Sequence, residues 1–431
     1  MLDVRGLVLG VCLGLTLGIG GPARAGGRTQ EAFAREALAA LRDGGLDCAH
    51  DAQDFTIRCD NGQVTFLQNS FERWEAAGNK AERKAIVERL VSLVTHPPSP
   101  LPDTWEEAAP HVRLRIRPPH WDLAMEQAAR QAGSTTPTPA TPGRPLAGTV
   151  IVHIVYDLPD AIAMVPPSKL EAWGVDFDAA IDQALVNVRA AWPKPFTEFA
   201  PGIYAAQVGD DYDSARMLMI PEVQALRLAP PILALPITRN HLYLASETDP
   251  AAVARLLELA QAGPSIPGGF DNLAPLVLRD GQWHAWEPGP GIADRAGWAD
   301  LLVRNRGTWY AEAKRVLEAR FAAEERDIFV GSFGAVELEE GHPRSYTTWT
   351  PAHAWIPRTE VVAVVRQVQG GDDDRVLLVP WSAIEAHASE FITPVPGVHP
   401  AYFEHRGPAS SEVFERLVPF DLLKPATETE P

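Results

Sequence analysis

The chain has 431 residues, of which 46% are apolar, and this composition excludes a largely disordered protein. Its 38 lysines and arginines are outnumbered by 56 aspartates and glutamates, which gives a net charge of −18. A chain this acidic repels the phosphates of nucleic acid and of anionic membranes, so we expect neither as a partner.

The first 25 residues have the features of a signal peptide. Residues 7–20 form an apolar run that is too short to span a bilayer comfortably, and the Ala-Arg-Ala sequence at 23–25 is a small-x-small cleavage signal. The alternative is an uncleaved N-terminal anchor. We favour cleavage, which leaves no stable membrane anchor and predicts a periplasmic or secreted protein.

Cleavage leaves two cysteines, Cys48 and Cys59, in a segment whose alternating pattern predicts a β-hairpin. Phe55, Ile57 and Cys59 share one face of the second strand, so both thiols point toward the same apolar side. In an oxidising compartment we expect a disulfide that contributes about 3 kcal/mol. The alternative is a metal site that includes His50, but the segment lacks the four ligands and paired spacing typical of zinc.

Helical and strand patterns mix along the chain, which favours an α+β fold with a mixed, mainly antiparallel sheet and flanking helices. The strand predicted at 149–156 is a β-branched run, typical of a strand buried on both faces. The other predicted strands are at 64–67, 112–117, 161–165, 203–208, 232–235, 241–245, 276–279, 283–286, 328–338, 361–367 and 375–379. Helices are predicted at 31–41, 81–94, 121–131, 178–192, 250–263, 298–306, 309–325 and 382–391, with a further helix starting at 167.

Composition divides the mature chain into two predicted domains. The first covers residues 28–286, and a proline- and threonine-rich stretch at 133–145 without a hydrophobic face predicts a mobile surface insertion within it. The second is a smaller C-terminal α+β unit over 290–425. Its hairpin turn at 370–374 contains three aspartates, which we interpret as a solvated turn rather than as a cation site.

Local signals mark where several helices start. Ser168 with Glu171, and Ser382 with Glu385, have the spacing of a capping box, in which the serine and glutamate side chains pair with backbone N–H groups. The Asp-Pro dipeptide at 249–250 predicts another helix start, because proline lacks an N–H that would otherwise have no partner there.

Five short segments follow one another in an order known from one family of bacterial proteins. They are Gln68–Phe71, Tyr156–Asp160, Ala184–Asn187, Gly209–Arg216 and Ala234–Leu242. With these segments, residues 28–286 resemble the YtpQ-like family, a domain of unknown function. The resemblance implies a shared fold but no activity, cofactor or catalytic residue, since none is established for the family. The chain departs from the family at Asn240, where an acidic residue is usual, and in its insertion, C-terminal extension and secretion signal.

The first candidate site is the acidic loop that contains Asp210, Asp211 and Asp213. Its three carboxylates and the hydroxyl of Ser214 lie between a predicted strand and a predicted helix. Asp213 or Ser214 can cap that helix, and this is the interpretation that we favour. The alternative is that the clustered carboxylates bind a divalent cation or act as acid and base.

The second candidate site is formed by Arg239 and Asn240, in the turn between two predicted strands. An arginine there can hold a ligand carboxylate or phosphate through two parallel hydrogen bonds. It can also pair with Asp211 or Asp213 and so order two loops, which we favour. Convergence of both loops on one pocket would instead indicate a ligand-binding site.

Common catalytic and cofactor motifs are absent from the sequence. It contains no His-Glu-x-x-His, Gly-x-Ser-x-Gly, Ser-x-x-Lys, Walker A or Gly-x-Gly-x-x-Gly, so we expect no metal and no cofactor. The leading hypothesis is a non-enzymatic periplasmic or secreted binding protein whose partner is a small molecule or a protein. The alternative is a metal-assisted hydrolase that acts on an envelope substrate through Asp210, Asp211 and Asp213. A third hypothesis is that the acidic surface binds a basic partner in a salt-sensitive manner.

Overall fold

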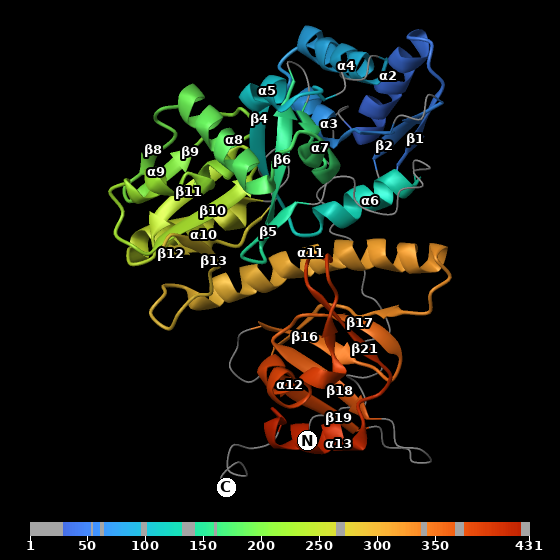
Figure 1. Cartoon of the computed structure of the whole chain (residues 1–431), viewed down its shortest axis with the longest axis vertical. Helices are drawn as coiled ribbons and strands as arrows, with labels where there is room; N and C mark the ends of the chain where they lie inside the picture. The colour runs from blue at the N-terminus through green and yellow to red at the C-terminus, as the bar shows by residue number, and fades with distance from the viewer. Residues whose placement is uncertain are drawn as a thin grey trace. The chain divides into compact units, whose positions relative to one another are not determined.

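The computed structural model describes residues 29–52, 55–60, 64–95, 101–131, 143–158, 162–263, 272–337, 343–366 and 375–423. The predicted signal peptide, residues 133–142 of the predicted insertion and the acidic turn at 370–374 lie outside this part of the chain. Within it, helices and mainly antiparallel sheets form the α+β fold that the sequence predicts (Figure 1). No described helix is both long and apolar enough to cross a membrane.

The described residues divide into two compact units. The first ends at Thr95, and the second contains the residues from Leu101 onward together with Val64. The domain boundary that the sequence suggests between residues 286 and 290 falls inside the second unit and stays a prediction.

The first unit combines three helices with a three-stranded sheet of order β1-β2-β3. Its elements are α2 (Gln30–Asp43), β1 (Cys48–Asp51), β2 (Thr56–Cys59), β3 (Val64–Phe66), α3 (Gln68–Ala76) and α4 (Lys80–Thr95). Helix α2 begins after Thr29, whose Oγ1 accepts the N–H of Ala32 (3.1 Å). The helices bury aromatic side chains such as Phe33 and Trp74 in a shared core. The sequence predicts every one of these elements except α3.

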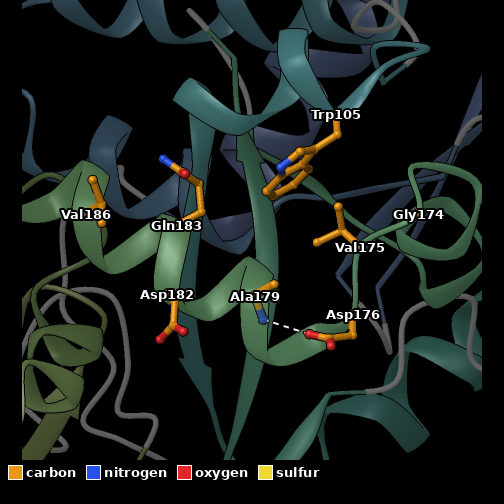
Figure 2. Close-up of a pocket in the computed structure, with 8 residues that line it drawn as sticks. All are labelled: Trp105, Gly174, Val175, Asp176, Ala179, Asp182, Gln183 and Val186. Atoms are coloured by element: carbon orange, nitrogen blue, oxygen red, sulfur yellow. Dashed lines mark hydrogen bonds between the residues drawn. The ribbon is translucent and has the colours of Figure 1, made fainter.

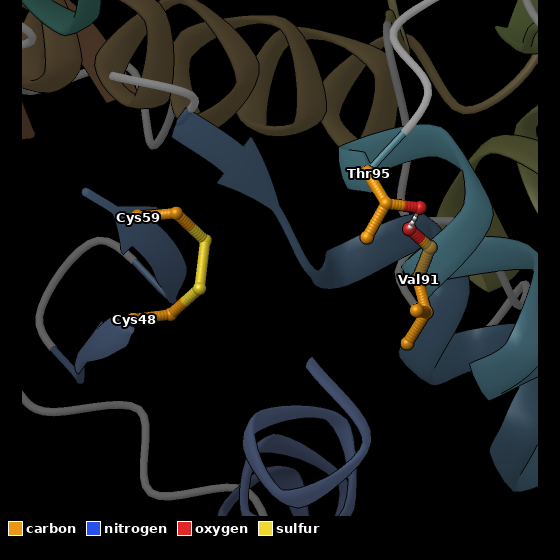
Figure 3. The surroundings of a disulfide bond; sticks show 4 residues. All are labelled: Cys48, Cys59, Val91 and Thr95. Atoms are coloured by element: carbon orange, nitrogen blue, oxygen red, sulfur yellow. Dashed lines mark hydrogen bonds between the residues drawn. A yellow bond between two sulfur atoms is a disulfide. The ribbon is translucent and has the colours of Figure 1, made fainter. Parts of the chain in front are cut away.

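Cys48 and Cys59 form the disulfide that the sequence predicts (Figure 3). They lie directly opposite each other in the β1–β2 pair, with their Cα atoms 4.0 Å apart. The ring of His50 packs against the edge of Phe55, with the ring centroids 5.8 Å apart. The hairpin is therefore cross-linked by a disulfide, a bond typical of proteins from oxidising compartments.

Replacing both cysteines with alanine is expected to lower the free energy of unfolding by about 3 kcal/mol, because the unfolded chain is no longer cross-linked. Urea denaturation of the oxidised protein and of the double variant measures this difference. Wild-type protein treated with a reductant is the control, and it should unfold at the urea concentration of the variant. A difference below about 1 kcal/mol would contradict the prediction.

Strand β6 is the buried central strand that the sequence predicts at 149–156. It pairs with three antiparallel neighbours. This sheet contains β4 (Val112–Arg117), β5 (Arg144–Leu146), β6 (Val150–Asp157) and β7 (Ile162–Met164). The surrounding helices are α5 (Trp105–Ala108), α6 (Trp121–Gln131), α7 (Pro167–Ala172) and α8 (Phe177–Ala191). Helix α8 buries Ala184 and Val188, and it ends at Ala191, one residue before the predicted end; Trp192 is 41% exposed.

A six-stranded antiparallel sheet follows, in the order β13-β12-β10-β11-β9-β8. Its strands are β8 (Thr197–Ala200), β9 (Ile203–Ala206), β10 (Ile232–Thr238), β11 (His241–Ser246), β12 (Leu276–Arg279) and β13 (Gln282–Ala285), and its helices are α9 (Ile220–Gln224) and α10 (Pro250–Ala262). Helix α10 begins where the sequence predicts, because the carboxylate of Asp249 accepts the N–H groups of Ala251 (3.0 Å) and Ala252 (3.1 Å).

Helix α11 (Arg295–Ala323) is one continuous helix, so the prediction of two helices at 298–306 and 309–325 is wrong. Gly307 lies inside it rather than ending it. Tertiary packing accounts for this continuity, since both ends of the helix are anchored in apolar cores. Trp298 packs with the six-stranded sheet, and Phe321 packs with strands from the C-terminal part of the chain. Figure 1 shows α11 passing between these two groups of strands.

The C-terminal part of the second unit contains two four-stranded sheets, of order β14-β17-β21-β20 and β15-β16-β18-β19. Its strands are β14 (Phe329–Val330), β15 (Gly334–Glu337), β16 (Pro343–Trp349), β17 (His353–Pro357), β18 (Val361–Arg366), β19 (Arg375–Pro380), β20 (Thr393–Pro394) and β21 (Tyr402–Arg406), and its helices are α12 (Trp381–His387) and α13 (Ser411–Leu417). The single strand predicted at 328–338 is thus two strands, β14 and β15, in different sheets. The hairpin formed by β18 and β19 is as predicted.

Neither predicted capping box forms. Helix α7 has Pro166 at its N-cap and α12 has Pro380, so Ser168 and Ser382 lie within the first helical turn and make no cap hydrogen bond. A proline at the N-cap has no side-chain atom that can accept a hydrogen bond from the first turn of the helix. The Ser-x-x-Glu spacing is therefore present in both helices, but it is displaced from the position where capping operates.

Candidate functional site

The structure brings the predicted site residues together at one end of the six-stranded sheet. The acidic loop follows β9, and Arg239 and Asn240 form the turn between β10 and β11. Asp211 Oδ1 accepts hydrogen bonds from Arg239 Nε (2.7 Å) and Asn240 Nδ2 (2.9 Å). The N–H of Asp211 donates to Asn240 Oδ1 (2.7 Å). The two loops are therefore joined by an ion pair and by amide contacts, as in the interpretation that the sequence favours.

Arg216 holds the other two aspartates of the loop. Its Nη2 donates to Asp210 Oδ2 (2.6 Å), and its Nη1 donates to Asp213 Oδ1 (2.8 Å). Arg216 is 1% exposed and Asp213 is fully buried. The Asp213 carboxylate also accepts the N–H groups of Val208 (3.0 Å) and Gly209 (2.7 Å). These two bonds connect Asp213 to residues that precede it in the chain, not to the first turn of the helix that follows. The 3-10 helix at 214–218 has no side-chain cap, so the predicted helix-cap role of Asp213 or Ser214 is wrong.

The surroundings shift the pKa values of these carboxyl groups in opposite directions. Burial raises the pKa of Asp211, but the Arg239 charge and the Asn240 hydrogen bond outweigh it, and the pKa lies below its ordinary value. Burial also raises the pKa of Asp213. The hydrogen bonds from Gly209 and Val208 lower it by less than burial raises it, so the pKa lies above its ordinary value. Both carboxylates are engaged in holding the loops together, which is a structural role.

The geometry gives no support to a metal site in the acidic loop. Among the described residues, no group of three or more His, Cys, Asp or Glu side chains is arranged to hold a metal ion. Asp210, Asp211 and Asp213 are each paired with an arginine instead. The arrangement of these three residues therefore does not support the hypothesis of metal-assisted hydrolysis through them.

A pocket of about 460 Å³ lies beside the start of α8 (Figure 2). Its polar side chains include Asp176, Asp182 and Gln183, all on or next to this one helix. Asp176 caps α8 by accepting the N–H of Ala179 (2.8 Å), so its carboxylate has a structural role. Val186, on the same helix, is 54% exposed. We call this the α8 pocket, and its polar groups do not converge from separate elements as those of a binding site do.

A second pocket, of about 260 Å³, lies where α6 packs against α11, and we call it the α6–α11 pocket. Its walls come from four separate elements: α6, the end of α11, β17 and the segment between β20 and β21. The lining residues are Asp122, Leu123, Glu126, Arg320, Trp355, Val395, Pro396, Gly397, Val398 and His399. This combination of an apolar wall with a few polar groups from different elements is typical of ligand-binding sites.

Asp122 is fixed at the wall of this pocket by two hydrogen bonds. Nε2 of His153 donates to its Oδ1 (2.7 Å), and the N–H of Gly143 donates to its Oδ2 (3.0 Å). His153 is 2% exposed and lies in the middle of β6. His399 lies close enough to feel the charge of Asp122, but burial dominates and lowers the pKa of His399 below its ordinary value. Burial therefore favours the uncharged form of the His399 imidazole.

Three arginines and two glutamates form a charge cluster beside Asp122. Glu126 accepts hydrogen bonds from Arg130 (2.9 Å) and lies 3.6 Å from Arg320. Glu324 in turn lies 3.1 Å from Arg320 and 3.4 Å from Arg130. Arg326 also pairs with Glu324, at 3.2 Å. The cluster therefore joins α6 to α11 through three arginines and two glutamates.

No motif in the sequence marks Asp122, His153 or His399 as site residues. One signal was present, because His153 interrupts an otherwise apolar β-branched run, and a buried imidazole requires a polar partner. The identity of that partner could not be predicted, since Asp122 is 31 residues away in sequence. Nothing in the local pattern of the 395–399 segment predicts that it lines a pocket.

Comparison with known proteins does not add to this description. No protein-family model matches the chain, and no curated protein and no solved structure is detectably similar to it. The resemblance to the YtpQ-like family therefore stays a prediction.

Proposed function

We propose that the protein is an exported binding protein that takes a small ligand in the α6–α11 pocket. The observation that carries this proposal is the convergence of Asp122, His399 and an apolar wall from four separate elements. The pocket is small against the roughly 300–1,000 Å³ of drug-sized sites, which favours a small ligand. The predicted binding residues Asp210, Asp211, Asp213, Arg239 and Asn240 lie elsewhere, and in this proposal they stabilise the loops of the sheet.

The composition of the pocket favours binding over covalent catalysis. Asp122 and His153 make the kind of contact that orients a general base, but a nucleophile is also required for covalent catalysis. The described lining residues include no Ser, Thr, Cys or Lys, and the lining carboxylates of Asp122 and Glu126 are already held by hydrogen bonds or ion pairs. His153 is moreover almost completely buried, and its Nε2 is bonded to Asp122. We therefore assign the pair to positioning the Asp122 carboxylate.

The place of action that fits this proposal is the periplasm or the extracellular space. The Cys48–Cys59 disulfide supports an oxidising compartment. The signal-peptide pattern of the first 25 residues supports export. The resemblance of residues 28–286 to the YtpQ-like family belongs to this proposal, and it implies a shared fold but no activity.

A fragment screen by thermal shift tests the binding site. We expect fragments that raise the melting temperature of the wild type to have no effect on Val395→Trp, because the indole would occupy the pocket. The matched control is Val186→Trp, which places the same side chain in the α8 pocket. Fragments should stabilise this control as they stabilise the wild type. Failure of every fragment to bind, or binding that Val395→Trp leaves intact, would contradict the proposed function.

A further inference from the structure

The charge of the α6–α11 pocket indicates which ligands it accepts. Arg320 is the one cationic side chain among its described lining residues, and Glu126 and Glu324 already flank that guanidinium. A ligand anion would have to displace these carboxylates and would also approach Asp122. The pocket is therefore unsuited to a carboxylate or a phosphate.

Asp122 retains the capacity to bind a donor. A carboxylate offers about four acceptor positions, and His153 and Gly143 use one on each oxygen. The Asp122 side chain is 15% exposed, at the wall of the pocket. No arginine or lysine pairs with it among the described residues. Asp122 is therefore a lining carboxylate that His153 and Gly143 hold in position by hydrogen bonds and that has acceptor capacity left.

The other walls suit the remainder of an organic cation. Leu123, Trp355 and Val398 add apolar and aromatic side chains to the lining of the same pocket, and all three are buried. His399 in its uncharged form offers a ring nitrogen without adding a repelling charge. A bare metal ion would not suit this environment, because the described residues provide no group of three carboxylate, imidazole or thiolate ligands.

From this arrangement we infer that the ligand is a small organic ammonium ion with an apolar body. Its ammonium group donates to Asp122, and its hydrocarbon part lies against Leu123, Trp355 and Val398. The inference rests on the proposed function, since it names the chemical class that the same pocket binds. Charge-assisted hydrogen bonds of this kind are about twice as strong as neutral ones, so charge should dominate the selectivity.

Three probes of matched shape test the inference on the wild-type protein. Benzylamine, benzyl alcohol and benzoate share a ring and differ in the charge of one substituent. We expect isothermal titration calorimetry to show benzylamine binding at least ~10-fold more tightly than the other two, as one charge-assisted bond allows. Equal affinity for benzyl alcohol, or tighter binding of benzoate, would overturn the inference without the need for any variant.

A substitution then locates the ammonium contact. Asp122→Asn keeps the size of the side chain and removes its charge, and it should lower the affinity for benzylamine by ~10-fold or more while leaving benzyl alcohol binding within about 2-fold. The control is Asp182→Asn, the same change in the α8 pocket, which should bind benzylamine as the wild type does. Unchanged benzylamine affinity in Asp122→Asn, with a native circular dichroism spectrum, would overturn the inference.

The inference and the proposed function fail in distinguishable ways. If neutral or anionic fragments bind, lose their binding in Val395→Trp, and benzylamine does not bind, then the ligand class is wrong and the binding function stands. If no compound shows binding that Val395→Trp abolishes, the proposed function is wrong and the inference is overturned with it.

Discussion

Replacing Arg216 with methionine is expected to lower the free energy of unfolding by about 3–5 kcal/mol at pH 7, the cost of breaking a buried ion pair from one side. The guanidinium is 1% exposed and is the positive partner of both Asp210 and Asp213. Asp210 can turn toward solvent, but Asp213 is fully buried and would keep an uncompensated charge. Urea denaturation with circular dichroism detection measures the loss.

The stability that Arg216→Met loses should depend on pH. The pKa of Asp213 is already raised by burial, so the folded state binds this proton more tightly than the unfolded state does. Ionisation of Asp213 therefore removes stability as the pH rises from its unfolded pKa to its folded pKa. Without Arg216 the folded pKa rises further, because a neighbouring positive charge is lost. The difference between variant and wild type should then be largest at neutral pH and should shrink in acid.

The matched control for this experiment is Arg255→Met. Arg255 also pairs with a carboxylate three residues away, Glu258, but both side chains are more than half exposed. Exposed pairs of this kind contribute about 0–1 kcal/mol, so Arg255→Met should unfold close to the wild type. Equal effects of the two substitutions, or an Arg216→Met loss that is constant with pH, would contradict a buried charge cluster around Arg216.

Replacing Trp298 with alanine is expected to cost about 3–5 kcal/mol, which is typical of removing a large aromatic side chain from a core. Trp298 is fully buried in α11, and its ring meets Trp286 edge to face at a centroid distance of 5.0 Å. The indole attaches the first half of α11 to the core of the six-stranded sheet. Its loss leaves a cavity that neighbouring side chains fill only in part.

The control for Trp298→Ala is Trp192→Ala. Trp192 is 41% exposed and contacts the Arg216 guanidinium at 6.0 Å from its ring centroid. Because a cation–π contact contributes about 0.5–2 kcal/mol depending on its exposure, this variant should lose about that amount in the same urea titration. A Trp298→Ala loss no larger than that of Trp192→Ala would show that α11 is not anchored through Trp298.

Much of the fold is predictable because local rules and tertiary packing agree. The Asp-Pro start of α10 is one example, since the carboxylate caps the helix and the proline removes an unpaired N–H. The boundaries of β4 and α6 are also as predicted. Failures occur where packing overrides the local signal. The sequence pattern predicts two helices at 298–306 and 309–325, but α11 continues through Gly307 because apolar cores at both ends hold the helix.

The candidate site was less predictable than the fold for a physical reason. The ion pair between Asp211 and Arg239 was foreseeable, because the two loops carry opposite charges. The acidic loop follows β9, and the turn with Arg239 leads into β11, which pairs with β9. The α6–α11 pocket instead depends on how α6 packs against α11 and on the position of the 395–399 segment. Asp122 and His399 are far apart in sequence, and no local pattern encodes their distance in space.

The double attachment of α11 also has a practical consequence for recombinant work. A fragment that stops at residue 286 would lack Trp298 and would expose the indole of Trp286, which is 1% accessible in the intact chain. A fragment that begins after α11 would equally uncover the aromatic surface that Tyr310 and Phe321 cover. Such fragments are expected to aggregate through these surfaces. Expression vectors that divide the chain between Thr95 and Leu101 instead separate the two compact units, and both ends of α11 stay covered.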